Sequence, residues 1–179
     1  HVNSRRQRQM CIRDRHDSHH IGKILINPEN SNHLVIGVTG HLYSKNENRG
    51  VYVTKDGGKN WNRTLYVNDV SGIIDMSETP GDFNVMYATS WEKDRKAWNF
   101  DEDGHSSGIY KSIDGGANWS LISNDESGFP TGAGVGRIGI AVFDKDIVYA
   151  VIDNQNFRET TEKKLDQGLT KESFIGMSL

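Results

Sequence analysis

Apolar and polar residues alternate in short runs along most of this chain, and polar turns separate the runs. One run occurs three times, and each copy follows a polar turn: residues 33–38 (HLVIGV), 84–89 (NVMYAT) and 146–151 (DIVYAV). Another apolar stretch precedes each of these turns, at residues 23–26, 72–76 and 137–142. Alternation with a period of two, bounded by turn residues, predicts β-strands.

The predicted strands group into sets of four. The first set lies near residues 22–27, 33–39, 49–55 and 60–66, and the second near 71–76, 84–90, 107–113 and 118–122. A third set begins near 136–142 and 146–152 and is not completed. Because sequential strands usually pair with one another, we expect antiparallel sheets of four strands each.

An eight-residue pattern, [ST]-x-D-x-G-x-x-W, follows the third strand of the first two sets. Its two copies begin 58 residues apart and consist of Thr54, Asp56, Gly58, Trp61 and of Ser112, Asp114, Gly116, Trp119. Glycine supplies the positive φ of a hairpin turn, and an aspartate at the head of a turn accepts hydrogen bonds from the turn backbone. We therefore interpret both copies as residues that stabilise a hairpin turn rather than as a ligand-binding or catalytic site.

The repeat also indicates an architecture. A repeat of roughly 40–60 residues made of short strands is typical of a β-propeller blade. We predict an all-β chain with blade one at residues 16–66, blade two at 67–123 and part of a third blade at 124–155. Because a closed propeller needs roughly 4–8 blades, we interpret the chain as a fragment that packs against the remaining blades of the same full-length chain.

The eight-residue pattern resembles the Asp-box, or bacterial neuraminidase repeat. That repeat occurs in sialidases, xyloglucanase-like glycosidases, photosystem assembly factors and sortilin-type receptors. Over about residues 17–155 the chain looks more specifically like bacterial sortilin-like or "glycosyl hydrolase" repeat proteins, on the second Asp-box and residues 20–23 (HIGK), 40–43 (GHLY) and 136–139 (GRIG). This resemblance implies an exported protein, extracellular or periplasmic, and it does not by itself imply hydrolysis.

Both ends of the chain differ from the middle. Residues 10–15 (MCIRDR) resemble the translation of a sequencing adaptor, and residues 1–15 are basic without apolar periodicity. We expect residues 1–15 to be a disordered assembly artefact, and they contain Cys11, the only cysteine, so no disulfide framework is expected. We interpret residues 156–179 as a charged tail or an insertion with some helical tendency.

Composition excludes several classes of function. The 179 residues carry a net charge of −3, which gives no electrostatic case for binding nucleic acid or an anionic membrane. No apolar run approaches the roughly 18 residues that span a membrane. The chain is 35% hydrophobic with 19 glycines, which suits a turn-rich β protein.

Strand direction predicts where a ligand would bind. The turn between strands one and two lies at the Asp-box end of each blade, and the long, chemically rich loops lie at the opposite end. Loops on a rigid scaffold commonly carry function. We select eight residues as candidates for ligand binding: Trp91, Arg95, Trp98, His41, Tyr43, His105, His20 and Arg137. Aromatic rings beside charged groups suit a glycan or a peptide, although Trp91 and Trp98 could instead cap the core.

The sequence does not identify catalytic residues. Glycoside hydrolysis needs two carboxylates at a defined separation, and spacing selects no pair among Glu92, Asp94, Asp101, Glu102 and Asp103. A sialidase would need several arginines converging on a substrate carboxylate, for which Arg49, Arg95 and Arg137 are available. His16, Asp17, His19 and His20 match no zinc pattern. We predict no metal and no cofactor.

We therefore expect ligand recognition, of a peptide or a glycan, by the end opposite the Asp-boxes. The alternative is a piece of a sialidase-like or xyloglucanase-like glycoside hydrolase that acts through a carboxylate pair. A third hypothesis is a structural assembly module.

Overall fold

A computed structural model describes residues 20–156 of the chain. The sequence-based hypotheses for residues 1–15, for His16, Asp17 and His19, and for the tail from residue 157 onward lie outside these residues. Within the described part, the chain is all-β with antiparallel sheets, and its helical content is one 3₁₀ turn, η1 (Asp125–Ser127). The all-β class is confirmed.

Two sheets contain four strands each, and two smaller sheets contain two each. The first sheet has the order β1 (Ile21–Ile26), β2 (Leu34–Val38), β3 (Gly50–Thr54), β4 (Asn62–Leu65). The second has the order β5 (Ser71–Thr79), β6 (Asp82–Glu92), β9 (Gly108–Ser112), β10 (Ser120–Leu121). The third pairs β11 (Val135–Val142) with β12 (Val148–Asn154), and a short hairpin pairs β7 (Asp94–Arg95) with β8 (Phe100–Asp101).

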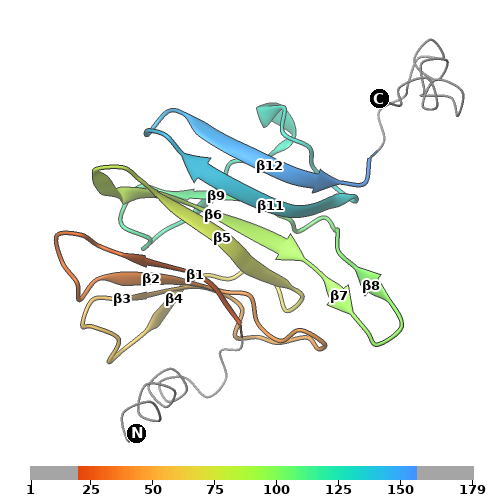
Figure 1. The fold of residues 1–179 in the computed structure, drawn as a ribbon, viewed down its shortest axis with the longest axis horizontal. Coiled ribbons are helices and arrows are strands. Elements are labelled where there is room, and N and C mark those ends of the chain that lie inside the picture. The colour runs from red at the N-terminus through yellow and green to blue at the C-terminus, as the bar shows by residue number, and fades with distance from the viewer. Residues whose placement is uncertain (1–19, 157–179) are drawn as a thin grey trace, which may run out of the picture.

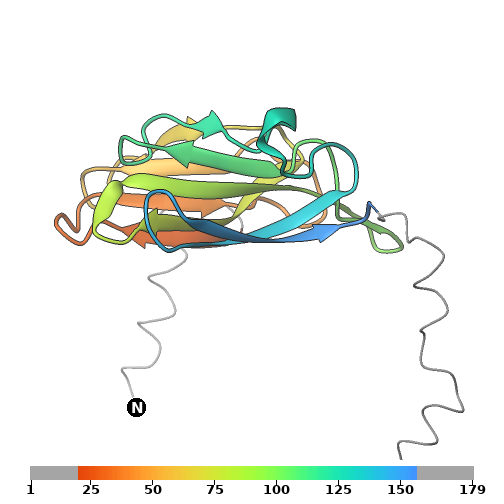
Figure 2. The same cartoon turned by 90° about the horizontal axis from the view of Figure 1, so that it is seen from above.

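The sheets lie one after another in chain order. Figure 1 shows β1–β4 at one side, β5, β6 and β9 in the middle, and β11 and β12 at the other side. Seen from above, the strands of all three sheets run along the length of a flattened body (Figure 2). Each chain segment therefore packs mainly against the sheets that precede and follow it.

Two apolar clusters fill the spaces between the sheets. The first joins the first and second sheets, with Val35, Val53, Ile73 and Met86 among its fully or nearly fully buried members. The second joins the second sheet to β11 and β12, and its buried members are Tyr87, Ile109, Val135 and Ile138. Alternation along each strand produces these faces, because successive side chains point to opposite sides of a sheet.

The predicted strands differ from the observed ones in two places. The strand expected near residues 118–122 is reduced to Ser120–Leu121. The segment of residues 91–106, expected to be a loop, instead extends β6 through Glu92 and forms the β7–β8 hairpin. Charged and aromatic residues dominate this segment, so it carries no alternation of apolar and polar residues from which the hairpin could have been predicted.

Candidate functional site

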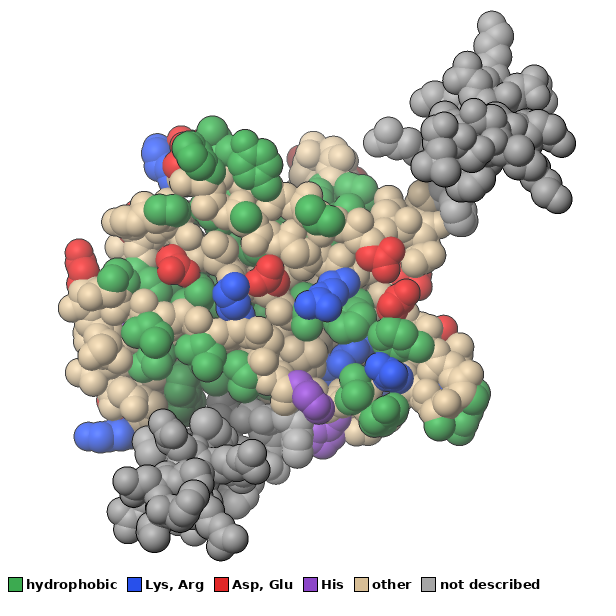
Figure 3. Space-filling view, viewed as in Figure 1, with side chains coloured by type: hydrophobic (Ala, Val, Ile, Leu, Met, Phe, Trp, Pro, Cys, Tyr) green, Lys and Arg blue, Asp and Glu red, His purple; other side chains and the backbone are tan. Residues whose placement is uncertain are grey.

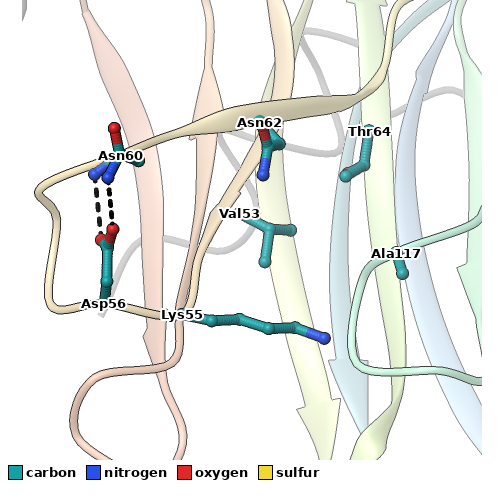
Figure 4. A pocket seen from close by; sticks show the side chains of 7 residues that line it. All are labelled: Val53, Lys55, Asp56, Asn60, Asn62, Thr64 and Ala117. Atoms are coloured by element: carbon teal, nitrogen blue, oxygen red, sulfur yellow. Dashed lines mark hydrogen bonds between the residues drawn. The ribbon is translucent and has the colours of Figure 1, made fainter.

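The turn after β3 is held by a compact hydrogen-bond network. Thr54 Oγ1 donates to Asp56 Oδ1 at 2.7 Å and accepts from Gly58 N at 3.0 Å. Asn60 donates its backbone N–H to Asp56 Oδ1 at 2.9 Å and its side-chain amide to Asp56 Oδ2 at 2.7 Å, as Figure 4 shows. Trp61 Nε1 donates to Gly58 O at 3.0 Å. Both carboxylate oxygens of Asp56 therefore serve the turn itself.

The turn after β9 repeats this network bond for bond. Ser112 Oγ donates to Asp114 Oδ1 at 2.8 Å, and Asn118 donates to both Asp114 oxygens at 2.9 and 2.7 Å. Trp119 Nε1 donates to Gly116 O at 3.0 Å and also to Thr64 Oγ1 of the first sheet at 3.2 Å. The second tryptophan thus links two sheets as well as closing its own turn.

These networks govern the charge of both aspartates. Hydrogen bonds from Asn60 and Thr54 lower the pKa of Asp56 to about 2. Burial acts to raise the pKa of Asp114, but hydrogen bonds from Asn118 and Ser112 outweigh it and the pKa is lowered. Both groups are held as carboxylates at neutral pH, in the form that accepts hydrogen bonds.

A depression of about 370 Å³ lies beside the first of these turns. Its lining comes from the first sheet, its turn and the second turn: Val53, Lys55, Asp56, Asn60, Asn62, Thr64 and Ala117 (Figure 4). Its carboxylate, Asp56, is already fully engaged by the turn. This depression therefore offers a ligand fewer uncommitted polar groups than the opposite end does.

The two turns lie at one common end of the sheets. We call the turns at residues 54–61 and 112–119 the box turns. Gly57 N donates to Asn32 O, in the turn between β1 and β2, and Gly115 N donates to Asn84 O, near the start of β6, both at 3.0 Å. In the second sheet, Ser112 pairs with Met86 while Gly108 pairs with Ser90, so the end of β6 at Trp91 lies away from the box turn. The box turn and the segment around Trp91 therefore lie at opposite ends of the second sheet.

Arg49 organises the loops at this opposite end. It is 2% exposed, and its guanidinium donates to the carbonyls of Thr39, His41 (2.8 Å), Ser44 (3.0 Å) and Asp69 (2.9 Å). Burial lowers the pKa of Arg49, and the nearby Asp69 acts in the opposite direction. Because its donors are used by backbone carbonyls, Arg49 shapes the β2–β3 loop and is not a free group for a substrate carboxylate.

A larger, open depression lies at the same end, between the second and third sheets. Its volume is about 570 Å³, and it is lined by Trp91, Arg95, Phe100, Glu102, Arg137, Gly139, Val151, Ile152 and Asp153. Trp91 Nε1 donates to Glu102 O at 2.7 Å, and the Trp91 and Phe100 rings meet edge to face with centroids 6.0 Å apart. These two contacts fix the end of β6 against the β7–β8 hairpin.

Three cations surround these rings. Lys93 Nζ lies 5.3 Å and Arg137 Cζ 6.0 Å from the Trp91 ring centre. Arg95 Cζ lies 5.1 Å from the Phe100 ring centre and 5.7 Å from that of Tyr43. The ion pairs found within residues 20–156 involve none of these three cations. Such contacts hold a cation over a ring without neutralising its charge, so these three groups keep their positive charge beside the carboxylates of Glu102 and Asp153.

The structure brings some of the candidate residues together and leaves others apart. Trp91, Arg95 and Arg137 line the large depression, and Tyr43 approaches it through Arg95. Trp98 is 84% exposed between β7 and β8 and does not line it.

The candidate histidines make contacts of their own. The Nδ1 atoms of His20 and His41 lie 3.1 Å from Gly40 O and 3.0 Å from Ser44 Oγ respectively, and His105 is an exposed residue after β8. None of the three lines the depression.

Four charged or aromatic residues of this region were not selected from the sequence as candidates for ligand binding: Phe100, Glu102, Asp153 and Lys93, although Glu102 is one of the five carboxylates considered for hydrolysis. Phe100 and Glu102 lay in the segment already singled out, but nothing in their spacing marked them as lining residues. Asp153 follows the third apolar run and reaches the depression only because β12 packs beside β11. Lys93 is 5% exposed, but its neighbours in the sequence are charged, so the sequence pattern does not indicate that it is buried.

Over the described residues, no group of three or more His, Cys, Asp or Glu side chains is arranged to hold a metal ion. Among those same residues, no helix is long and apolar enough to cross a membrane.

No protein-family model matches the chain, and no curated protein matches it. Among solved structures, the chain is similar to a GH74 xyloglucanase from Xanthomonas campestris, with a TM-score of 0.31 and 14% sequence identity. The match covers 75% of this chain and 27% of that one. This similarity is weak, and the chain spans about a quarter of the length of that enzyme.

Proposed function

We propose that the chain is part of an Asp-box β-propeller that binds a ligand, a glycan or a peptide, at the end opposite the box turns. The blades would comprise residues 16–66, 67–123 and 124–155. Support for a propeller comes from the two four-stranded antiparallel sheets in sequential order and from the identical turn networks at one end. A sortilin-like, exported protein, extracellular or periplasmic, is the setting that the sequence resemblance favours.

The single observation that carries the binding proposal is the depression at Trp91. It combines two aromatic rings with side chains of both charges, Arg95 and Arg137 against Glu102 and Asp153. Small-ligand sites typically combine apolar and aromatic side chains with a small number of polar groups that orient the ligand. The box-end depression lacks this combination, because its lining holds no aromatic ring and its carboxylate is used internally.

Uncovered apolar side chains support partnership with further blades. Ile24 and Ile26 on β1 are 55% and 54% exposed, and Tyr149 on β12 and Phe143 after β11 are 66% and 68% exposed. Figure 3 shows hydrophobic side chains gathered between charged ones on the face viewed in Figure 1. Exposed apolar sheet faces of this kind are normally covered by another element.

An array of neutral and acidic oligosaccharides and short peptides tests the binding proposal. Phe100→Ala and Arg137→Met should each weaken the strongest interaction about tenfold, because each removes part of the lining without removing buried core. Lys55→Met and Asn62→Ala, in the box-end depression, are the matched controls and should bind normally. Weakened binding by the controls alone would overturn the proposal.

A glycoside hydrolase is the second candidate function. The specific observation in its favour is that two carboxylates, Glu102 and Asp153, line the same depression. Hydrolysis of a bound glycoside would use one as the acid and the other as nucleophile or base. Full activity in both Glu102→Gln and Asp153→Asn would exclude this pair, whereas loss of turnover with retained binding in either variant would support it.

A further inference from the structure

Lys93 is a buried lysine without a carboxylate partner. It lies between β6 and β7 and is 5% exposed. Its Nζ lies over the Trp91 ring, and within residues 20–156 no ion pair reaches it. A lysine side chain that is buried to this degree without a counter-charge is rare, because low-dielectric surroundings disfavour the charged amine.

A small cavity adjoins Lys93 and shares Arg95 with the lining of the large depression. It is bounded by the β2–β3 loop, the β4–β5 loop and β7, and its lining consists of Leu42, Ser44, Lys45, Arg49, Val70, Lys93, Asp94 and Arg95. Its volume is about 10 Å³, which is space for one atom group of the size of a water molecule. Four of the eight lining residues are basic and one is acidic.

Three of the five charged lining residues already have hydrogen-bond or ion-pair partners. Arg49 donates to four backbone carbonyls, Lys45 lies 3.8 Å from Asp69, and Asp94 lies 3.1 Å from Lys96. The two positive charges that remain are those of Lys93 and Arg95. Arg95 contacts the Tyr43 and Phe100 rings, which leave its charge in place.

The electrostatic surroundings of Lys93 also favour an anion beside it. Burial lowers the pKa of Lys93, and the positive charges of Arg49 and Arg95 lower it further. All three effects disfavour the charged amine, and an anion beside Lys93 would reverse them.

We propose that this cavity is an anion subsite in which one oxygen of a carboxylate binds between Lys93 and Arg95. A water molecule would fill the space but would leave both charges unbalanced. The cavity takes one oxygen atom of an anion, and the rest of the anion must lie outside it. A planar carboxylate leaves one further oxygen outside, whereas a tetrahedral phosphate or sulfate leaves three, and the comparison of acetate with phosphate below distinguishes the two. The subsite stands on this cavity alone and holds whether or not the Trp91 depression binds the ligand proposed above.

The test is an NMR titration of the full chain with sodium acetate. The ¹³Cε–¹Hε resonances of Lys93 and Lys96 would be followed from pH 7 to 11 in 100 mM (roughly physiological) chloride and again with acetate replacing chloride at equal ionic strength. Acetate should raise the pKa of Lys93 by at least about half a unit, equivalent to a roughly threefold preference of acetate for the charged amine. The Lys96 resonance should not respond to acetate, because its amine already has Asp94 beside it.

Two variants keep this test sharp. Lys93→Met assigns the resonance and should abolish the acetate-dependent shifts of neighbouring backbone amides. Arg95→Met leaves Lys93 in place and should reduce its response to acetate, which guards against a Lys93 variant that fails to fold. Lys111→Met is the matched control, because the Lys111 amine also lies over an aromatic ring, that of Tyr87, and does not line the cavity. It should respond as the unaltered protein does.

The outcomes separate the alternatives. No response of Lys93 to acetate would overturn the proposal and leave a cavity that holds water only. A larger response to inorganic phosphate than to acetate would overturn the assignment to a carboxylate. Normal acetate binding together with no ligand on the oligosaccharide and peptide array would instead count against the function proposed for the Trp91 depression.

Discussion

Arg49→Met is the perturbation whose effect can be worked out most fully from the structure. The substitution keeps much of the aliphatic stem and removes a guanidinium that donates to four backbone carbonyls. A hydrogen bond from a charged donor contributes roughly 1.5–3 kcal/mol, so four give about 6–12 kcal/mol before the cost of burying the charge. That cost is several kcal/mol per ion.

Subtracting the cost of burying the charge from the contribution of the four hydrogen bonds predicts that Arg49→Met lowers the free energy of unfolding by about 3–5 kcal/mol. The loss arises because four carbonyls are left without donors. Arg49→Lys should recover only part of this loss, because an ammonium cannot reproduce the planar fork of donors. Arg63→Met is the matched control: Arg63 is exposed, donates to Glu47 O and lies 4.3 Å from the Tyr66 ring centre. Its loss should cost at most about 1 kcal/mol.

Equilibrium unfolding in urea at neutral pH measures all three variants, with the free energy taken from the midpoint and slope. Limited proteolysis of the same samples should show cleavage within residues 39–48 in Arg49→Met. A loss below about 1 kcal/mol, or one equal to that of Arg63→Met, would refute the assignment of Arg49 as the group that organises this end.

The remaining predictions concern the turn network and the contact between sheets. Asp56 has a pKa of about 2 in the folded state against an ordinary 3.8, so its ionised form stabilises the fold above pH 3.8 and the contribution disappears as the pH falls through 2. Acid unfolding of Asp56→Asn should therefore depend less steeply on pH in that window. A Cβ at Gly72 would press on the Thr39 backbone, so Gly72→Ala should lower the unfolding free energy by at least about 2 kcal/mol. In the same denaturation assay Gly139→Ala, whose Cβ would lie 3.9 Å from Asp75 Oδ2, should be nearly neutral.

Much of the fold could be predicted because its signals are local. Apolar alternation and turn residues locate every strand of the first and second four-stranded sheets to within a few residues, and the repeated turn shows that two sheets have equivalent ends. The β7–β8 hairpin could not be predicted, since its strands are two residues long and its stability comes from the Trp91 and Phe100 contacts rather than from its own pattern.

The candidate site was predictable only in part. Loop position selects Trp91 and Arg95, and Arg137 is selected as one of the available arginines; the depression contains all three. Trp98 belongs to the same segment, yet it lies outside the depression because the hairpin carries it into solvent. Lys93 and Asp153 depend on contacts between strands far apart in the chain, and no local pattern reports such contacts.

Fluorine NMR of the chain labelled with 5-fluorotryptophan tests most directly whether ligand binds at the end opposite the box turns. The protein has four tryptophans: Trp61 and Trp119 in the box turns, Trp91 in the large depression and Trp98 on the hairpin. Titration with the strongest binder from the array should shift the Trp91 resonance and leave those of Trp61 and Trp119 unchanged. A shift of Trp61 or Trp119 with no change at Trp91 would contradict the proposed site.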